Sequence, residues 1–477
     1  MLNPHALVYL VAHMVPALIG FLALILYTHL LSPAEYGIYV VGASVAGIIS
    51  ALCFYWIRLS VSRYQARSPE LDLRADAIVA YAATAAVAAC LAPAAILVFR
   101  PDIGPGFIAA ALLFSLSMNA FEISQEFKRA QFNPLRFTTI AVIRSLSGLA
   151  LGYTAIELGG GGLGLLLAIG ASFLIGTAFS FQKSTAKPLR FSSLGHLKQF
   201  MYYGLPFSLG ALAGTLHNTL DRLAVAYLFG QSGVGYYGLA ADMARQVIAI
   251  LAASVASAMF PIAFRTLAQN GARATRERLK EGIELLFAVI APVTAWLAIS
   301  GDVVAKTLLG AEFQESVAIL LPFLALGRMC GALNTYYVQI SFQLAEKPLL
   351  QVMHDAMIFA LNLALLFPLT RLFGLPGTAA AVLMAESLGI LIGTGLSRKA
   401  FRLPLNGRGL LHVLAATAVM AAVVYVTKIA EGGHGLVALM SMLGSGGVAY
   451  AGSAFLLDVA GIRTSLASFY GRSIPAE

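Results

Sequence analysis

The stretch GGLGLLLAIGASFLIGTAFSF, residues 161–181, contains no charged residue and is long enough to cross a bilayer as a helix. A spanning helix needs about 20 mainly apolar residues. Similar apolar stretches recur along the whole chain, separated by short polar loops. They predict an all-α polytopic membrane protein with about fourteen spans, at 6–30, 37–57, 77–99, 107–126, 137–156, 162–181, 203–229, 238–262, 282–300, 317–342, 351–370, 375–397, 410–428 and 435–457.

The composition leaves little sequence for a folded domain outside the membrane. The chain has 477 residues, of which 59% are hydrophobic and 11% are charged, and its mean hydropathy is +0.83. Soluble domains carry about 25% charged residues. The formal net charge of +9 does not indicate nucleic-acid binding, because the basic residues lie in short loops beside apolar spans. The three cysteines lie in apolar segments, which is typical of buried thiols and not of metal or redox pairs.

The basic residues of the loops indicate how the chain is oriented. With the fourteen predicted spans, all but four of the loop Lys and Arg residues fall on one side of the membrane. The four exceptions are Arg100, Lys306, Arg371 and Lys428. Basic loops stay in the cytoplasm. We therefore expect both termini to be cytoplasmic.

Matching segments in the two halves of the chain indicate an internal repeat. The segment LSPAEYGIYVVGA, from Leu31, is similar to FGQSGVGYYGLAA, from Phe229, and GGLGLLLA, from Gly161, is similar to GLPGTAAA, from Gly374. Six predicted spans separate each pair, so the two copies have the same orientation, as in many transporters. We expect an N-terminal lobe at 1–200, a C-terminal lobe at 201–400, and two further helices with a cytoplasmic tail at 401–477.

Several of these motifs also carry a family resemblance. The chain resembles the polysaccharide-transport branch of the multidrug/oligosaccharidyl-lipid/polysaccharide exporter superfamily, especially the Wzx-type oligosaccharide flippases. The resemblance is in LSPAEYGIY from Leu31, LPFSL from Leu205, LDRLAVAYLFG from Leu220, VGYYGLA from Val234 and GLPGTAAA from Gly374.

The resemblance implies two six-helix lobes that form a V and move by alternating access. It implies a function in surface polysaccharide or exopolysaccharide assembly, in which oligosaccharide units on undecaprenyl diphosphate move from the inner to the outer leaflet. Membrane lipids, a polysaccharide polymerase and a chain-length regulator are the implied partners. Asp221-Arg222 falls where relatives carry a similar polar pair.

Four arginines lie within predicted spans: Arg144, Arg222, Arg245 and Arg328. A charge in the bilayer core costs about 2.5–3.5 kcal/mol on insertion scales, so it faces a partner or a polar cavity. A guanidinium offers a planar set of donors that suits a diphosphate. We expect these four residues to bind the substrate in a cationic cavity. The competing interpretation is that each Arg pairs with an acid on a neighbouring helix, as Arg245 can with Asp242 three residues before it.

Other polar side chains in the spans are candidates for ion coupling or sugar contact. His217 and Asp221 are four residues apart on one helix face, and Glu386 is alone near the centre of its span. These residues are candidates for binding a coupling ion, H⁺ or Na⁺, although a hydrogen-bonded packing cluster has the same pattern. Tyr336 and Tyr337 are candidates for contact with sugar rings. We expect no metal, no other cofactor and no nucleic-acid partner.

Two other functions remain alternatives. An ion-coupled multidrug exporter would favour acidic and aromatic walls for organic cations, whereas the charges in these spans are as often basic as acidic. A membrane-embedded polysaccharide polymerase or ligase would need a large outer loop or clustered carboxylates, and the sequence predicts neither. No G-x-x-x-x-G-K-[ST] motif occurs, and no catalytic residues are expected. The residues leave the glycan and the energy source open.

Overall fold

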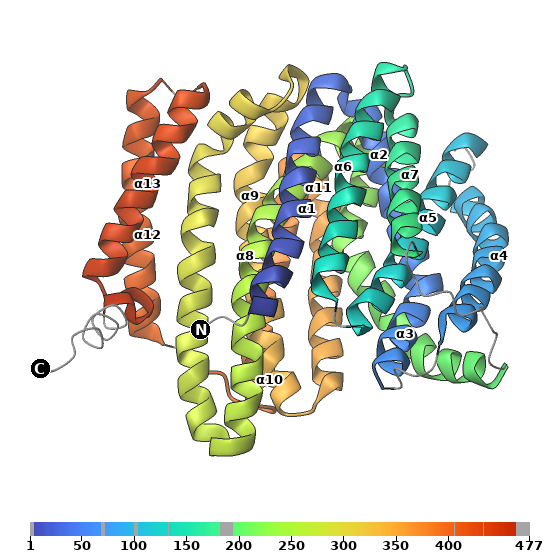
Figure 1. Ribbon diagram of the computed structural model, residues 1–477. Helices are drawn as coiled ribbons and strands as arrows, with labels where there is room; N and C mark the ends of the chain where they lie inside the picture. The colour runs from blue at the N-terminus through green and yellow to red at the C-terminus, as the bar shows by residue number, and fades with distance from the viewer. Residues whose placement is uncertain are drawn as a thin grey trace, which may run out of the picture. The chain divides into compact units, whose positions relative to one another are not determined.

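The computed structural model is all-helical, as the apolar spans predict (Figure 1). It describes residues 4–67, 72–99, 104–131, 133–181, 194–404, 406–432 and 434–463, and no strand occurs among them. The α-helices are α1 (Pro4–Leu30), α2 (Pro33–Ile49), α3 (Tyr55–Arg67), α4 (Arg74–Phe99), α5 (Pro105–Ala130), α6 (Pro134–Glu157), α7 (Gly161–Phe181), α8 (Leu194–Leu308), α9 (Gln314–Leu333), α10 (Gln339–Leu344), α11 (Pro348–Ser397), α12 (Gly407–Ala430) and α13 (Leu436–Leu456). Short π-helical turns, η1 (Ser50–Phe54) and η3 (Asn334–Val338), join α2 to α3 and α9 to α10, and 3₁₀ turns η2 (Ala311–Phe313) and η4 (Val459–Gly461) complete the set.

The chain divides into two compact units, Met1–Gly238 and Leu239–Glu477. The first unit contains α1 to α7 and the first part of α8, and the second contains the rest of α8 and α9 to α13. The lobe limits at residues 200 and 400 stay predictions from the sequence.

Helix α8 is a folded segment and not a straight rod. Its 115 residues would extend for roughly 170 Å at 1.5 Å per residue, several times the thickness of a bilayer core. Gly230 and Gly271 interrupt it with φ values of 68° and 75°, which glycine adopts without steric cost. In the second unit, Met259 packs against Gly282 across the turn at Gly271. The chain therefore reverses direction there.

A similar turn divides α11 in the second unit. Gly374 has φ 66° and ψ −145°, outside the helical region. Thr370 and Thr378, on either side of it, share a buried hydrogen bond of 2.8 Å. A Cβ at Gly377 would lie 1.9 Å from the carbonyl oxygen of Leu369. The GLPGTAAA motif is thus a tight helical hairpin, and Gly161, its counterpart in the first unit, also has a positive φ of 54°.

The LSPAEYGIY motif forms the capped start of α2. Ser32 accepts a hydrogen bond from the backbone of Glu35, whose side chain in turn accepts one from the backbone of Ser32, which is a capping box. A Cβ at Gly37 would lie 1.9 Å from the carbonyl oxygen of Gln231, and a Cβ at Gly235 would lie 2.0 Å from that of Pro33. The glycines matched in the repeat therefore bring two helices of the first unit into backbone contact.

Ten helices among the described residues are long and apolar enough to cross a membrane by length and composition. Large apolar side chains are exposed on many of them, as on Leu91 in α4 and Val448 in α13, as a lipid-facing surface requires. The chain is a multi-pass membrane protein. The total of fourteen spans stays a prediction. The turns in α8 and α11 are consistent with it, because each divides a long helix into shorter helical segments.

The helix of the second predicted span continues beyond its expected end. The spans predicted at 37–57 and 77–99 leave Arg58, Arg63 and Arg67 between them. These residues lie in α3, which continues α2 through η1, and their cytoplasmic location stays a prediction. Mean hydropathy falls at this point because the segment is polar, but the backbone remains helical.

Candidate functional site

A row of polar residues follows one face of α5 in the first unit. Ser115, Asn119, Glu122 and Glu126 are spaced by four, three and four residues, which places them on one side of a helix. Ser115 donates a hydrogen bond to the carbonyl oxygen of Ala46 at 3.2 Å. Ser50 donates one to Oδ1 of Asn119 at 2.7 Å. The row therefore faces α2 and η1.

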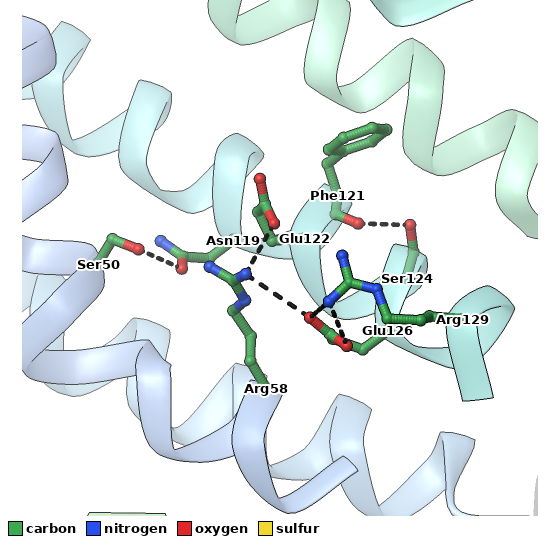
Figure 2. Close-up of polar contacts among 8 residues, drawn as sticks. All are labelled: Ser50, Arg58, Asn119, Phe121, Glu122, Ser124, Glu126 and Arg129. Carbon is green, nitrogen blue, oxygen red and sulfur yellow. Dashed lines mark hydrogen bonds and ion pairs between the residues drawn. The ribbon is translucent and has the colours of Figure 1, made fainter. Parts of the chain in front are cut away.

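Arg58 of α3 lies beside the two carboxylates of this row (Figure 2). Its Nη2 is 3.0 Å from Oε2 of Glu122 and 3.6 Å from Oε1 of Glu126. Arg129, one turn further along α5, contacts both oxygens of Glu126 at 3.1 and 3.3 Å. The cluster thus holds two guanidiniums and two carboxylates, and its formal charge is balanced.

The π-helical turn η1 explains why Ser50 and Arg58 both face α5. Eight residues of regular α-helix rotate by about 80° beyond whole turns, at 3.6 residues per turn. A π-helical turn accommodates one extra residue, which leaves a net offset of only about 20° from whole turns. The amide of Tyr55 bonds to the carbonyl oxygen of Ser50, closing this wider turn. The turn therefore brings a hydroxyl and a guanidinium onto the same face.

Arg144 of α6 lies in the same unit, and its guanidinium stacks over an aromatic ring. The guanidinium carbon is 3.8 Å from the centroid of Phe173 in α7, a cation–π geometry. Its Nε is buried without a hydrogen-bond partner. Among the residues that the structure describes, no carboxylate forms an ion pair with Arg144, although Glu122, Tyr39 and Tyr27 are within electrostatic range.

Asp221, in the first part of α8, is a buried acid with hydrogen-bond donors. Asp221 is only 1% exposed. It accepts a hydrogen bond of 2.6 Å from the hydroxyl of Tyr237 and one of 2.9 Å from the backbone amide of Arg222. His217, predicted with Asp221 to bind a coupling ion, and Arg222, predicted to bind the substrate, lie on the same stretch of α8. Tyr237 is itself fully buried.

The remaining predicted residues belong to the second unit. Glu386 is 6% exposed and accepts a hydrogen bond of 2.8 Å from Nδ2 of Asn334, the first residue of η3. Arg328 lies in α9. Arg245 pairs with Asp242 at 3.1 Å, the pair that their spacing allows.

The two candidate tyrosines occupy different surroundings. Tyr337 is buried and donates its hydroxyl hydrogen bond to the carbonyl oxygen of Pro404. The ring of Tyr336 lies 6.5 Å from that of Phe260. Among the described residues, no group of three or more His, Cys, Asp and Glu side chains is placed to hold a metal ion.

Sequence reasoning missed the cluster of Arg58, Glu122 and Glu126 as a unit. Its signal was present in the spacing of the polar residues along α5. Arg58 was assigned to a loop, however, so no basic partner was sought on the neighbouring span.

A model of the family described as polysaccharide biosynthesis protein matches residues 26–318. The chain belongs to this family. Comparison with curated protein sequences finds no match for this family member.

Its fold is similar to that of a structure described as lipid II flippase MurJ in an inward closed conformation. The TM-score is 0.75 at 14% identity, over 95% of this chain and 99% of the other. Two structures of a MATE multidrug transporter of the MOP superfamily are also similar. The inward-facing one has a TM-score of 0.66 at 16% identity and the outward-facing one 0.54 at 15%. Both comparisons cover 83% of this chain. They cover 97% of the inward-facing structure and 94% of the outward-facing structure. This family member therefore has the same fold as these transporters.

Proposed function

We propose that the protein is a flippase for lipid-linked oligosaccharides. It moves oligosaccharide units carried on undecaprenyl diphosphate from the inner to the outer leaflet of the bacterial cytoplasmic membrane, with both termini in the cytoplasm. The activity is transport by alternating access, without covalent chemistry. A polymerase and a chain-length regulator would use the units on the outer side.

The observation that carries this proposal is the environment of Arg144. A guanidinium within a spanning helix is costly, and a carboxylate partner is the usual compensation. Arg144 has the ring of Phe173 instead, and no ion pair with a carboxylate of the described residues. An anionic ligand would supply the missing counter-charge. A diphosphate suits this role, because its oxygens match the planar donors of a guanidinium.

The family and the fold also support a flippase. The family is described by polysaccharide biosynthesis, and one similar fold belongs to a flippase of a lipid-linked precursor. A coupling ion, H⁺ or Na⁺, would bind at Asp221 and His217 or at Glu386. Flipping assays in vesicles with an imposed gradient of either ion test that assignment, since an ion without effect is not coupled.

Multidrug export is the second candidate, and buried Asp221 favours it. An acid beside an aromatic ring, as Asp221 is beside Tyr237, suits an organic cation. A deletion strain separates the two functions. The flippase proposal expects accumulated carrier-linked sugar and loss of surface polysaccharide. Increased sensitivity to cationic drugs with normal polysaccharide would instead establish an exporter.

The proposal also predicts the effect of replacing Arg144 by Gln. A charged hydrogen bond contributes about 1.5–3 kcal/mol, so flipping of a polyprenyl-diphosphate oligosaccharide in proteoliposomes should fall by roughly ten- to hundredfold. Arg136→Gln, at the start of the same helix and without an ion pair among the described residues, is the matched control and should retain activity. Normal flipping by Arg144→Gln, at equal protein level, would refute the role of this residue.

A further inference from the structure

Glu122 contacts one guanidinium of the first unit and is within electrostatic range of a second. It is 3.0 Å from Nη2 of Arg58 and within electrostatic range of Arg144. The side chain of Phe121, its neighbour in α5, and Cβ of Arg144 both lie against Gly176 of α7. This shared contact places Arg144 and Glu122 at the same level of the helix bundle.

The two carboxylates of the cluster differ in how firmly they are held. The side chain of Glu126 is 7% exposed, and Arg129 of the same helix contacts both its oxygens. The side chain of Glu122 is 34% exposed, and Arg58 is its only ion-pair partner among the described residues. Glu126 therefore has a local partner that does not depend on Arg58. Glu122 is therefore the carboxylate that can move away from Arg58 at the lower cost in free energy.

The guanidinium of Arg58 needs a replacement anion when Glu122 leaves. Its side chain is 27% exposed, and its Nε is buried without a hydrogen-bond partner. Its second contact, with Glu126, is longer at 3.6 Å. A charge with so few hydrogen bonds is poorly satisfied in a membrane protein.

The charges on the helices around Glu122 favour a negatively charged ligand at Arg58. Helix α7 contributes no ionisable side chain. Helix α6 contributes Arg144, and α3 contributes Arg58. Removing the charge of Glu122 would leave a local excess of positive charge around Arg58 and Arg144. A second anion near Glu122 would be repelled while that carboxylate stays in place.

We infer that Glu122 is a built-in counter-ion for Arg58, beside Arg144, and that the diphosphate of the substrate displaces it from Arg58 when it binds. This inference rests on the proposed function, because it assigns a role within the same anionic site. In the unliganded protein, Glu122 is the nearer of the two carboxylates that pair with Arg58. When a diphosphate arrives, its oxygens take the place of the carboxylate at Arg58, and the bidentate geometry of a guanidinium favours that exchange. Glu122 thus lowers affinity and makes release possible.

The test is direct binding of diphosphate probes to the purified full chain in nanodiscs. The probes are inorganic pyrophosphate and a polyprenyl diphosphate incorporated in the disc. Glu122→Gln should bind a diphosphate about tenfold more tightly than the wild type, equivalent to about 1.4 kcal/mol. The gain should shrink at high salt, because part of the site is exposed. A larger gain for the polyprenyl probe identifies a lipid headgroup as the ligand, and an equal gain for both identifies the diphosphate alone.

Two controls separate this exchange from a change in net charge. Glu157→Gln removes the same charge from an exposed position at the other end of α6 and should leave affinity within twofold of wild type. The double variant Arg58→Gln/Glu122→Gln should lose the gain, because the displaced contact no longer exists. An unchanged or weaker affinity of Glu122→Gln, in protein with wild-type thermal stability, would overturn the inference. So would an equal gain in Glu157→Gln.

The binding result and the transport result are independent. Tighter diphosphate binding by Glu122→Gln, together with normal surface polysaccharide in a deletion strain, would retain the counter-ion and reject the flippase. Loss of polysaccharide in the deletion strain with no gain in binding would retain the flippase and reject the counter-ion.

Discussion

At the scale of single residues, the ionisable side chains in the helices have different kinds of partner. Arg245 has a carboxylate partner three residues away. Glu126 has two guanidiniums, and Asp221 has a phenol and a backbone amide. Arg144 has an aromatic ring. Each of the first three has a counter-charge or hydrogen-bond donors within the protein. The charge of Arg144 is the one that an anion from outside the protein would best compensate.

The hydrogen bond from Tyr237 to Asp221 predicts a specific loss of stability. Tyr237→Phe keeps the ring but removes the donor at 2.6 Å, and a buried acceptor that loses its partner costs about 1–3 kcal/mol. The melting temperature of the purified protein should therefore fall. Tyr202→Phe, at a position 88% exposed, should melt like the wild type. Equal melting temperatures for all three proteins would show that the bond adds no net stability.

At the scale of elements, glycines decide where helices turn and how closely they cross. Gly230, Gly271 and Gly374 allow turns with positive φ inside long helical segments. Gly37 and Gly235 instead allow contact between the backbones of two helices. Small residues at such crossings are a common source of helix association in membranes, where lipid weakens the hydrophobic driving force.

The crossing at Gly235 predicts that even a methyl group is harmful there. In Gly235→Ala, the added Cβ would lie 2.0 Å from the carbonyl oxygen of Pro33, so the two helices must separate. We expect a lower melting temperature and reduced flipping. Gly214→Ala, also in α8, has no heavy atom within 4 Å of the new Cβ and should be neutral or stabilising by up to about 1 kcal/mol. If both variants behave alike, the close crossing does not constrain the protein.

At the scale of the whole molecule, the alternation of basic loops predicts the orientation in the membrane. Single cysteines introduced at Glu312 and Glu346, in a protein without its three native cysteines, test this prediction. A membrane-impermeant thiol reagent should label Glu312→Cys in intact spheroplasts and Glu346→Cys only after permeabilisation. The reverse pattern would place the basic loops outside and would invert the proposed direction of transport.

The sequence by itself determined the helical class, the positions of most spans and the motifs that form turns. Apolar length is a local property, and a bilayer core accepts only segments that satisfy their own backbone hydrogen bonds. It also identified Arg144, Asp221 and Glu386 as ionisable residues within helices. Apart from the Arg245–Asp242 pair, which the spacing already allowed, only the tertiary structure decided which partner each charge has. Arg58 and Glu122 are far apart in the chain, and their contact depends on helix rotation, on the extra residue in η1 and on the close packing of the first unit. Hydropathy reports the cost of burying a charge, whereas the packed helices decide what compensates it.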